Sequence, residues 1–312
     1  MDKKIISPKL NEKKYFFLWI LTLLILVIVA GIGVFNILKG KSSGTKSNTS
    51  EQANSADNSE ISEFKKALLP AEGIILPVRW NDLGKRLTET GVIDEQKLIA
   101  IYDQRGGLSE EDKKLLYDSD NGNIIITAQN SGFLLNLLWA LGLGNKNPVL
   151  EKGPMQDPKY KGADRFASTG GWSIAKGNAM DHYSKHKFIT LTPTQQELVE
   201  KVSKNIYRPC CGNSTYFPDC NHGMAMLGFL QLMASQGMAE EEMYKTALTV
   251  NTFWFPDAYL TIAKYFQKKK VAWEDVNPKN VLGLEYSSAS GYKQVMTEVN
   301  PVQSQGGKRC GV

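Results

Sequence analysis

Residues able to bind a metal ion or to react as thiols gather in one short segment of this 312-residue chain. Three of the four cysteines and one of the three histidines fall within thirteen positions, at Cys210, Cys211, Cys220 and His222. Thiolate sulfur and imidazole nitrogen are ligands that suit zinc and copper. The spacing matches no standard zinc finger or ribbon. The cluster therefore predicts a zinc or copper site without fixing which metal it holds.

Two histidines upstream extend the set of candidate ligands. His182 and His186 stand in the pattern Asp-His-x-x-x-His, which begins at Asp181, and they would share one face if that stretch is helical. Thioether sulfur also suits Cu(I), and three methionines enter consideration for that reason: Met180, Met224 and Met226. Methionines at helical spacing are more often core residues, so we expect the histidines to be the stronger candidates.

Two other interpretations of the cysteines stay open. In the first they form structural disulfides, which are normal in an oxidising compartment, and four cysteines allow three pairings. In the second, Cys220 is the attacking thiolate of thiol–disulfide exchange and His222 is its base or electrostatic partner. The resolving thiol would then be Cys210 or Cys211. The fourth cysteine, Cys310, follows a Gly-Gly pair near the end of the sequence, and a tail of that kind could bring it to the cluster.

Helices joined by a loop must position the cluster. The expected elements are a helix over 192–207, a loop over 212–218, a helix over 224–235 and a third helix opening at the glutamates 240–242. Asp219 or Asn221 can cap the middle helix, which places Cys220 and His222 at its N-terminus. The helix dipole and the unpaired N–H groups there favour a thiolate, so they lower the pKa of a thiol.

Three motifs frame this segment. A helix opens with Leu191-Thr-Pro-Thr-Gln, a basic residue (Arg208) stands just before the first cysteines, and the last helix opens with Gly237–Glu242. In this layout residues 191–255 resemble the CcmH-type periplasmic thiol domain of cytochrome c maturation. The resemblance implies a membrane-bound domain that faces outside and reduces a partner through a Cys-x-x-Cys pair. This chain has adjacent cysteines there instead. A wider resemblance to a bacterial and archaeal membrane-anchored family implies no function.

The N-terminal region predicts a membrane anchor. Residues 15–38 are apolar and uncharged, and spanning a bilayer takes roughly 20 helical residues. The run is longer than the apolar part of a signal peptide and does not end in an A-x-A-like cleavage site. Five lysines precede it and three follow it, which places the N-terminus in the cytoplasm. We expect a cytoplasmic tail (1–14), a single transmembrane helix (15–38) in contact with membrane lipid, and a flexible linker (39–61) to an extracytoplasmic domain.

The net positive charge of the chain belongs to this same region. The formal charge is +5, of which residues 1–14 carry +3 and Lys39 with Lys41 carry +2, so residues 42–312 are neutral. A neutral domain lacks the basic surface of a nucleic-acid-binding protein. We therefore expect membrane lipid as one partner, a protein thiol as another if the cysteines exchange, and no nucleic acid.

The expected fold class is mainly α. Residues 62–150 are predicted to be the helical N-terminal half of the domain, and residues 151–312 the half with a three-helix unit that bears the cysteines and histidines. Further helices are expected at 62–69, 94–102, 109–117 and 130–143, with an irregular segment at 145–178. The Asp-rich turn at 118–123 lacks the glutamate and the glycine position of an EF-hand loop, so it predicts a turn into a short strand at 124–127.

Common enzyme motifs are absent from the sequence. It contains no phosphate-binding Gly-rich loop, no G-x-S-x-G and no H-E-x-x-H. Whether the protein is an enzyme therefore depends on the cysteines. The prediction that we carry forward is a membrane-anchored extracytoplasmic protein with a Cys/His metal site. A membrane-tethered thiol–disulfide protein is the alternative, and a binding domain with structural disulfides is a third possibility.

Overall fold

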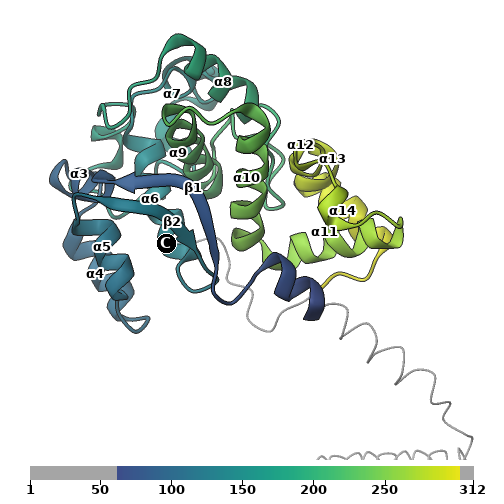
Figure 1. Ribbon diagram of the computed structural model, residues 1–312. Helices are drawn as coiled ribbons and strands as arrows, with labels where there is room; N and C mark the ends of the chain where they lie inside the picture. Colours follow the sequence, from purple (N-terminus) through teal and green to yellow (C-terminus); the bar gives the residue numbers. More distant parts are fainter. Residues whose placement is uncertain (1–61, 303–312) are drawn as a thin grey trace, which may run out of the picture. The chain divides into compact units, whose positions relative to one another are not determined.

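A computed structural model describes residues 62–302 of the chain. The predicted tail (1–14), membrane helix (15–38) and linker (39–61) lie outside the described residues, and so does Cys310. Among residues 62–302, none of the helices combines the length and the apolar character that crossing a membrane requires. The described part is mainly helical, in agreement with the predicted fold class (Figure 1).

The first half of the described chain contains a hairpin and several helices. After a helical segment at residues 62–68, the elements are β1 (Ile74–Asn81), α3 (Leu83–Glu89), α4 (Glu95–Asp103), α5 (Glu110–Tyr117), β2 (Asn121–Ile126), α6 (Ser131–Gly144) and α7 (Pro148–Lys152). The helix starts expected at Asp94 and Ser109 are confirmed because their caps form. The Asp94 side chain accepts the Lys97 N–H, and Ser109 makes a reciprocal capping box with Asp112.

β1 and β2 form an antiparallel two-stranded sheet, in which Ile74 lies opposite Ile126. The strand after residue 123 was predicted, and the structure confirms that the Asp-rich turn leads into it. The Asn121 amide closes this turn by donating to the main-chain oxygens of Lys114 and Asp118. β1 was not predicted, although its buried residues alternate with exposed ones along the strand.

The second half of the described chain is helical after an irregular segment. Residues 145–178 contain only α7 and three short 3-10 turns, as predicted. The helices that follow the 3-10 turn Ala179–Asp181 are α8 (Pro193–Ser203), α9 (Asn221–Ser235), α10 (Glu240–Trp254), α11 (Pro256–Lys268), α12 (Pro278–Leu282), α13 (Leu284–Ser287) and α14 (Ala289–Glu298), with a 3-10 turn at Trp273–Asp275. Figure 1 shows α9 and α10 between α3–α5 on one side and α11–α14 on the other.

Helices α6 and α9 pack together at the centre of the core. Both are buried along nearly their whole length. They approach so closely because glycines face each other: a Cβ on Gly142 would collide with the Met224 carbonyl, and one on Gly228 would collide with the Leu138 carbonyl. α6 comes from the predicted N-terminal half and α9 from the cysteine-bearing half, and one hydrophobic core includes residues of both.

The helices on either side of the cysteines have different boundaries from those expected. α8 ends at Ser203 and not near residue 207, because the chain beyond it bonds to other elements: the Asn205 side chain donates to the Lys279 carbonyl and the Tyr207 N–H to the Leu282 carbonyl. α9 begins at Asn221, so the loop between the two helices spans residues 204–220.

Candidate metal centre

The loop between α8 and α9 brings three thiols together. The sulfur atoms of Cys210, Cys211 and Cys220 all lie within 4.8 Å of one another, and the Cys211–Cys220 pair is separated by 3.7 Å. None of these three cysteines is part of a disulfide. They form the one group of metal-ligating side chains at this spacing among residues 62–302. The structure therefore brings three of the predicted ligands close enough together to hold one metal ion.

The spacing of the sulfurs suits a single metal ion. Two thiolates bound to one zinc ion at about 2.3 Å in tetrahedral geometry lie about 3.8 Å apart. The Cys211–Cys220 separation of 3.7 Å is close to this value. Three soft ligands at this spacing can hold zinc or copper, and the donor set does not choose between the two metals.

Cys220 occupies the N-cap position of α9. Its backbone is extended, with φ −119° and ψ 164°, and its carbonyl accepts the Met224 N–H that begins the helix. The predicted caps were Asp219 and Asn221, so the position of the cap is corrected by one residue. The consequence is that the Cys220 sulfur lies at the positive end of a 15-residue helix.

A buried arginine contacts the Cys220 sulfur. Arg208 is 1% exposed and its Nε–H donates to Cys220 Sγ at 3.1 Å. Its other nitrogens donate to the carbonyls of Asn213 and Phe217 and to Asp219 Oδ1, the last at 2.7 Å. One guanidinium thus joins the reactive sulfur to both halves of the loop. A fork of fixed N–H donors suits this role better than a lysine would.

Two neighbours accommodate this arginine: Asp219 pairs with its charge, and Gly223 leaves space for its guanidinium. The Asp219 carboxylate accepts from Arg208 and from the Asn213 amide, which donates to Oδ2 at 2.7 Å. Burial raises the pKa of this carboxyl, against the opposing effects of Arg208 and Asn213. Gly223, in the first turn of α9, lies against the guanidinium, and a Cβ there would collide with it. The sequence of the first turn of α9 is therefore adapted to the arginine.

The environment of Cys220 favours its thiolate form. Hydrogen bonds from the thiols of Cys210 and Cys211 keep the pKa of the Cys220 thiol well below its ordinary value; the positive charge of Arg208 and a hydrogen bond with His222 act in the same direction, and burial opposes them. The hydrogen bond with Cys210 lowers the pKa of Cys211, but its bond to the Cys220 thiolate and its burial outweigh this and raise that pKa to about 11. The three thiols are therefore unequal.

His222 lies beside the sulfur cluster but is not one of its three members. The ring is 5% exposed and packs on Phe255, with ring centroids 4.3 Å apart, and edge-on to Trp254. Its hydrogen bond with Cys220 stabilises the thiolate. In this arrangement His222 contacts a candidate metal-ligating sulfur, a position that neighbours of metal ligands commonly occupy.

The other predicted ligands lie elsewhere in the fold. His182 Nδ1 and His186 Nε2 are 3.1 Å apart, and His182 Nε2 lies 2.9 Å from the Lys176 carbonyl. The two rings are stacked, but on a turn after Asp181 and not on a helix, and the sulfur group does not include them. Asp181 accepts the Asn178 N–H within that turn. Met224 and Met226 are buried in the core, and Met180 packs against it.

Neighbouring helices fix the cysteine loop in place. The Cys211 carbonyl accepts the Ala289 N–H at the start of α14, and the Asp219 carbonyl accepts the Ser168 N–H. Asn251 of α10 donates to the Tyr207 carbonyl. With the bonds of Asn205 and Tyr207 to α12, the loop is bonded to four separate parts of the chain, which limits how far the sulfurs can move apart.

Sequence reasoning missed the Arg208–Asp219 pair as part of the site. Arg208 was noted only through the family resemblance, and Asp219 only as a helix cap. The available signal was an arginine two residues before the first cysteine and an aspartate directly before the third. Opposite charges that flank a cysteine cluster in this way suggest an ion pair at the sequence level. Whether the two side chains meet depends on the course of the loop.

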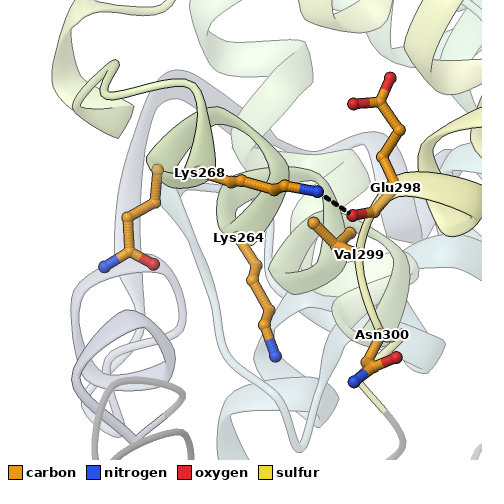
Figure 2. Close-up of a pocket in the computed structure, with 6 residues that line it drawn as sticks. Lys264, Lys268, Glu298, Val299 and Asn300 are labelled. Atoms are coloured by element: carbon orange, nitrogen blue, oxygen red, sulfur yellow. Dashed lines mark hydrogen bonds between the residues drawn. The ribbon is translucent and has the colours of Figure 1, made fainter.

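Two hollows on the surface hold neither cysteine nor histidine. One, of about 320 Å³, lies between α11 and the chain after α14, where Lys268 donates to the Glu298 carbonyl (Figure 2). Another, of about 390 Å³, is lined by residues 152–154, by Gln156 and Asp157, and by Tyr216, which belongs to the cysteine loop. Neither contains a group of metal-ligating side chains like that of the sulfur cluster.

Comparison of the chain with protein-family models, with curated proteins and with solved structures finds no match. The predicted resemblance to the CcmH-type thiol domain therefore stays a prediction.

Proposed function

We propose that this protein binds a metal ion, zinc or copper, through Cys210, Cys211 and Cys220. The observation that carries the proposal is the mutual approach of the three sulfurs to within 4.8 Å around a thiolate held by Arg208. Thiolates repel one another, and a bound cation removes that repulsion. A fixed loop that brings three sulfurs together therefore fits a metal ion better than it fits three unrelated thiols.

The neighbours of the sulfurs support this proposal. Arg208 and His222 both interact with Cys220, and N–H donors to a coordinating sulfur orient it and limit its reactivity. The exposed position of Cys210 leaves one side of the cluster open to solvent. A fourth ligand, from water or from a binding partner, can approach from that side, which suits an exchangeable metal better than a closed structural site.

Metal titration of the reduced, full-length protein tests the proposal. We expect one equivalent of Zn²⁺ to bind, and cobalt substituted for zinc to show sulfur-to-metal charge-transfer absorption. Cys220→Ser should abolish that absorption, whereas Ser235→Ala, at the far end of α9, should leave it unchanged. The absence of bound metal under reducing conditions would refute the proposal.

A thiol–disulfide protein acting on a partner is the second candidate function. The observation in its favour is the stabilised Cys220 thiolate at a helix N-terminus, 3.7 Å from Cys211. This function requires a reversible bridge among the cluster cysteines with a redox potential within the range of cellular dithiols. Equilibration with dithiothreitol buffers measures that potential. A bridge that never forms there removes this candidate.

We also propose that the domain is displayed outside the cytoplasm by a single N-terminal anchor. The support is the uncharged run at residues 15–38 and the excess of lysines before it. Protease treatment of intact and of permeabilised cells tests the orientation. Cleavage of the domain in intact cells is the expected result, and cleavage only after permeabilisation would contradict it.

A further inference from the structure

The three sulfurs differ in their access to solvent. Cys210 is exposed, whereas Cys211 and Cys220 are only partly accessible. The Cys220 sulfur accepts from Arg208, which is fully buried and paired with Asp219, so one side of this sulfur faces the interior. Cys210 is therefore the sulfur that a large molecule from solvent reaches most readily, and the Cys220 sulfur lies within 4.8 Å of it.

We infer that Cys210 is the site at which an external disulfide reacts, and that Cys220 completes the reaction by forming a Cys210–Cys220 bridge that expels the metal. The release of metal rests on the proposed metal function, whereas the order of the thiol reactions does not. The external reactant is a disulfide of a small thiol or of a protein.

The reaction balances as two exchange steps. Cys210 gives up its thiol proton and its sulfur attacks one sulfur of the external disulfide. The external S–S bond breaks, and the first external thiolate leaves and takes up that proton. The Cys220 thiolate then attacks Cys210 Sγ, which forms the internal S–S bond and releases the second external thiol. Two cysteines are oxidised, and one external disulfide is reduced to two thiols.

Geometry selects Cys220 over Cys211 as the resolving thiol. Cys210 and Cys211 are neighbours in the chain, with Cα atoms about 3.8 Å apart, which is shorter than the usual range for a disulfide. Cys220 comes from the start of α9, so it can approach Cys210 without that restriction. Arg208 holds the Cys220 sulfur in the cluster while the first step takes place.

The bridge removes two of the three sulfur ligands at once. Cys211 alone then remains as a thiol of the cluster, and its carbonyl stays bonded to the Ala289 N–H. One thiol does not hold zinc against competing ligands, because structural zinc sites take four ligands and catalytic sites take three from the protein. The site therefore couples an external disulfide to release of its metal.

Oxidation of the metal-free protein by glutathione disulfide tests the order of events. Full-length protein carrying Cys310→Ser serves as the background, so that only the cluster cysteines react. The added change Cys220→Ser should trap one glutathione on Cys210. The added change Cys210→Ser should slow the loss of thiols at least tenfold, and Cys211→Ser should leave the rate within twofold and still yield the bridge. Equal rates with Cys210→Ser, or glutathione trapped on Cys211, would overturn the inference.

The metal-loaded protein tests the link to release. In the Cys310→Ser background we expect one metal ion to be freed for each bridge formed, as followed with a colorimetric chelator and mass spectrometry. Retention of the metal after bridge formation would overturn this part. If reduced protein binds no metal at all, the proposed function fails, while the trapping result with Cys220→Ser still decides the order of the thiol reactions.

Discussion

The cysteine cluster and the His182–His186 pair both place metal-binding side chains in contact, yet their ligand atoms are engaged differently. Each ring nitrogen of His182 already lies within hydrogen-bonding distance of a protein atom, one of His186 and the other of the Lys176 carbonyl. At Cys220 the protein supplies donors to a sulfur, and a thiolate that accepts N–H groups can still bind a cation. Proximity of ligand residues therefore indicates a metal site only when their lone pairs stay accessible.

Removing a sulfur should have the largest effect on zinc affinity, and it distinguishes the cysteine cluster from the His182–His186 pair most clearly. Structural zinc binds with about 12 kcal/mol shared among four ligands, so loss of one sulfur in Cys220→Ser should weaken zinc binding by roughly 100-fold or more. His182→Ala should change zinc affinity by less than about twofold if its ring takes no part. Competition with a chromophoric chelator measures both variants. Equal losses in the two would show that the histidines belong to the site.

Changing the arginine should have the next largest effect. Neighbours of metal ligands typically contribute 10- to 100-fold in affinity, so we expect a loss of about this size for Arg208→Met. Arg208→Lys keeps the charge but loses the fork of donors, and it should fall between wild type and Arg208→Met. The same chelator competition gives the ranking. Wild-type affinity in Arg208→Met would show that the guanidinium only stabilises the loop.

A methyl group beside the arginine should have a smaller effect, on stability. Gly223→Ala places a Cβ against the Arg208 guanidinium, and overpacking of this kind costs about 1–3 kcal/mol. Gly212→Ala is the matched control in the same loop, because a Cβ there meets nothing within 4 Å. Chemical denaturation of the metal-free protein should therefore show a lower midpoint for the first variant alone. Equal midpoints would mean that the arginine has room to move.

Protonation of His186, in the histidine pair, should have the smallest effect, and this effect is on folding stability. Burial, followed by the nearby His182 and Lys185, lowers the pKa of His186 below its ordinary value of 6.5. The unfolded chain then binds a proton more readily than the folded chain, so this contribution to stability is complete above the ordinary pKa and falls as the pH drops through it. Denaturation midpoints from about pH 8 to about pH 5 should fall less in His186→Gln than in wild type. Parallel pH profiles would contradict this assignment.

The elements around the site were largely predictable because their signals are local. Proline at the start of α8, the capping box at Ser109 and the three glutamates that open α10 each act within one helical turn. β1 carries an equally local signal in the alternation of Leu76, Val78 and Trp80, and it could have been found from the sequence.

The partners of individual side chains were less predictable because they depend on distant segments. Asp219 was expected only as a helix cap, and the course of the loop around Arg208 makes it the partner of that charge instead. The end of α8 depends on carbonyls of α12, more than seventy residues away in sequence. The cysteine spacing in sequence likewise did not reveal that the three sulfurs meet while His182 and His186 pair apart from them.

The glycine contact between α6 and α9 has a mechanical consequence for the cysteine loop. Because the two backbones touch at Gly142 and Gly228, α9 has little freedom to slide or tilt, and Cys220 sits on its fixed end. Amide hydrogens in the middle of α9 should therefore be among the slowest in the protein to exchange with solvent deuterium, and those of the loop before it should exchange earlier. Binding or loss of a ligand at the sulfurs should then change the exchange rates of the loop amides, whereas those of α9 stay constant and serve as an internal reference.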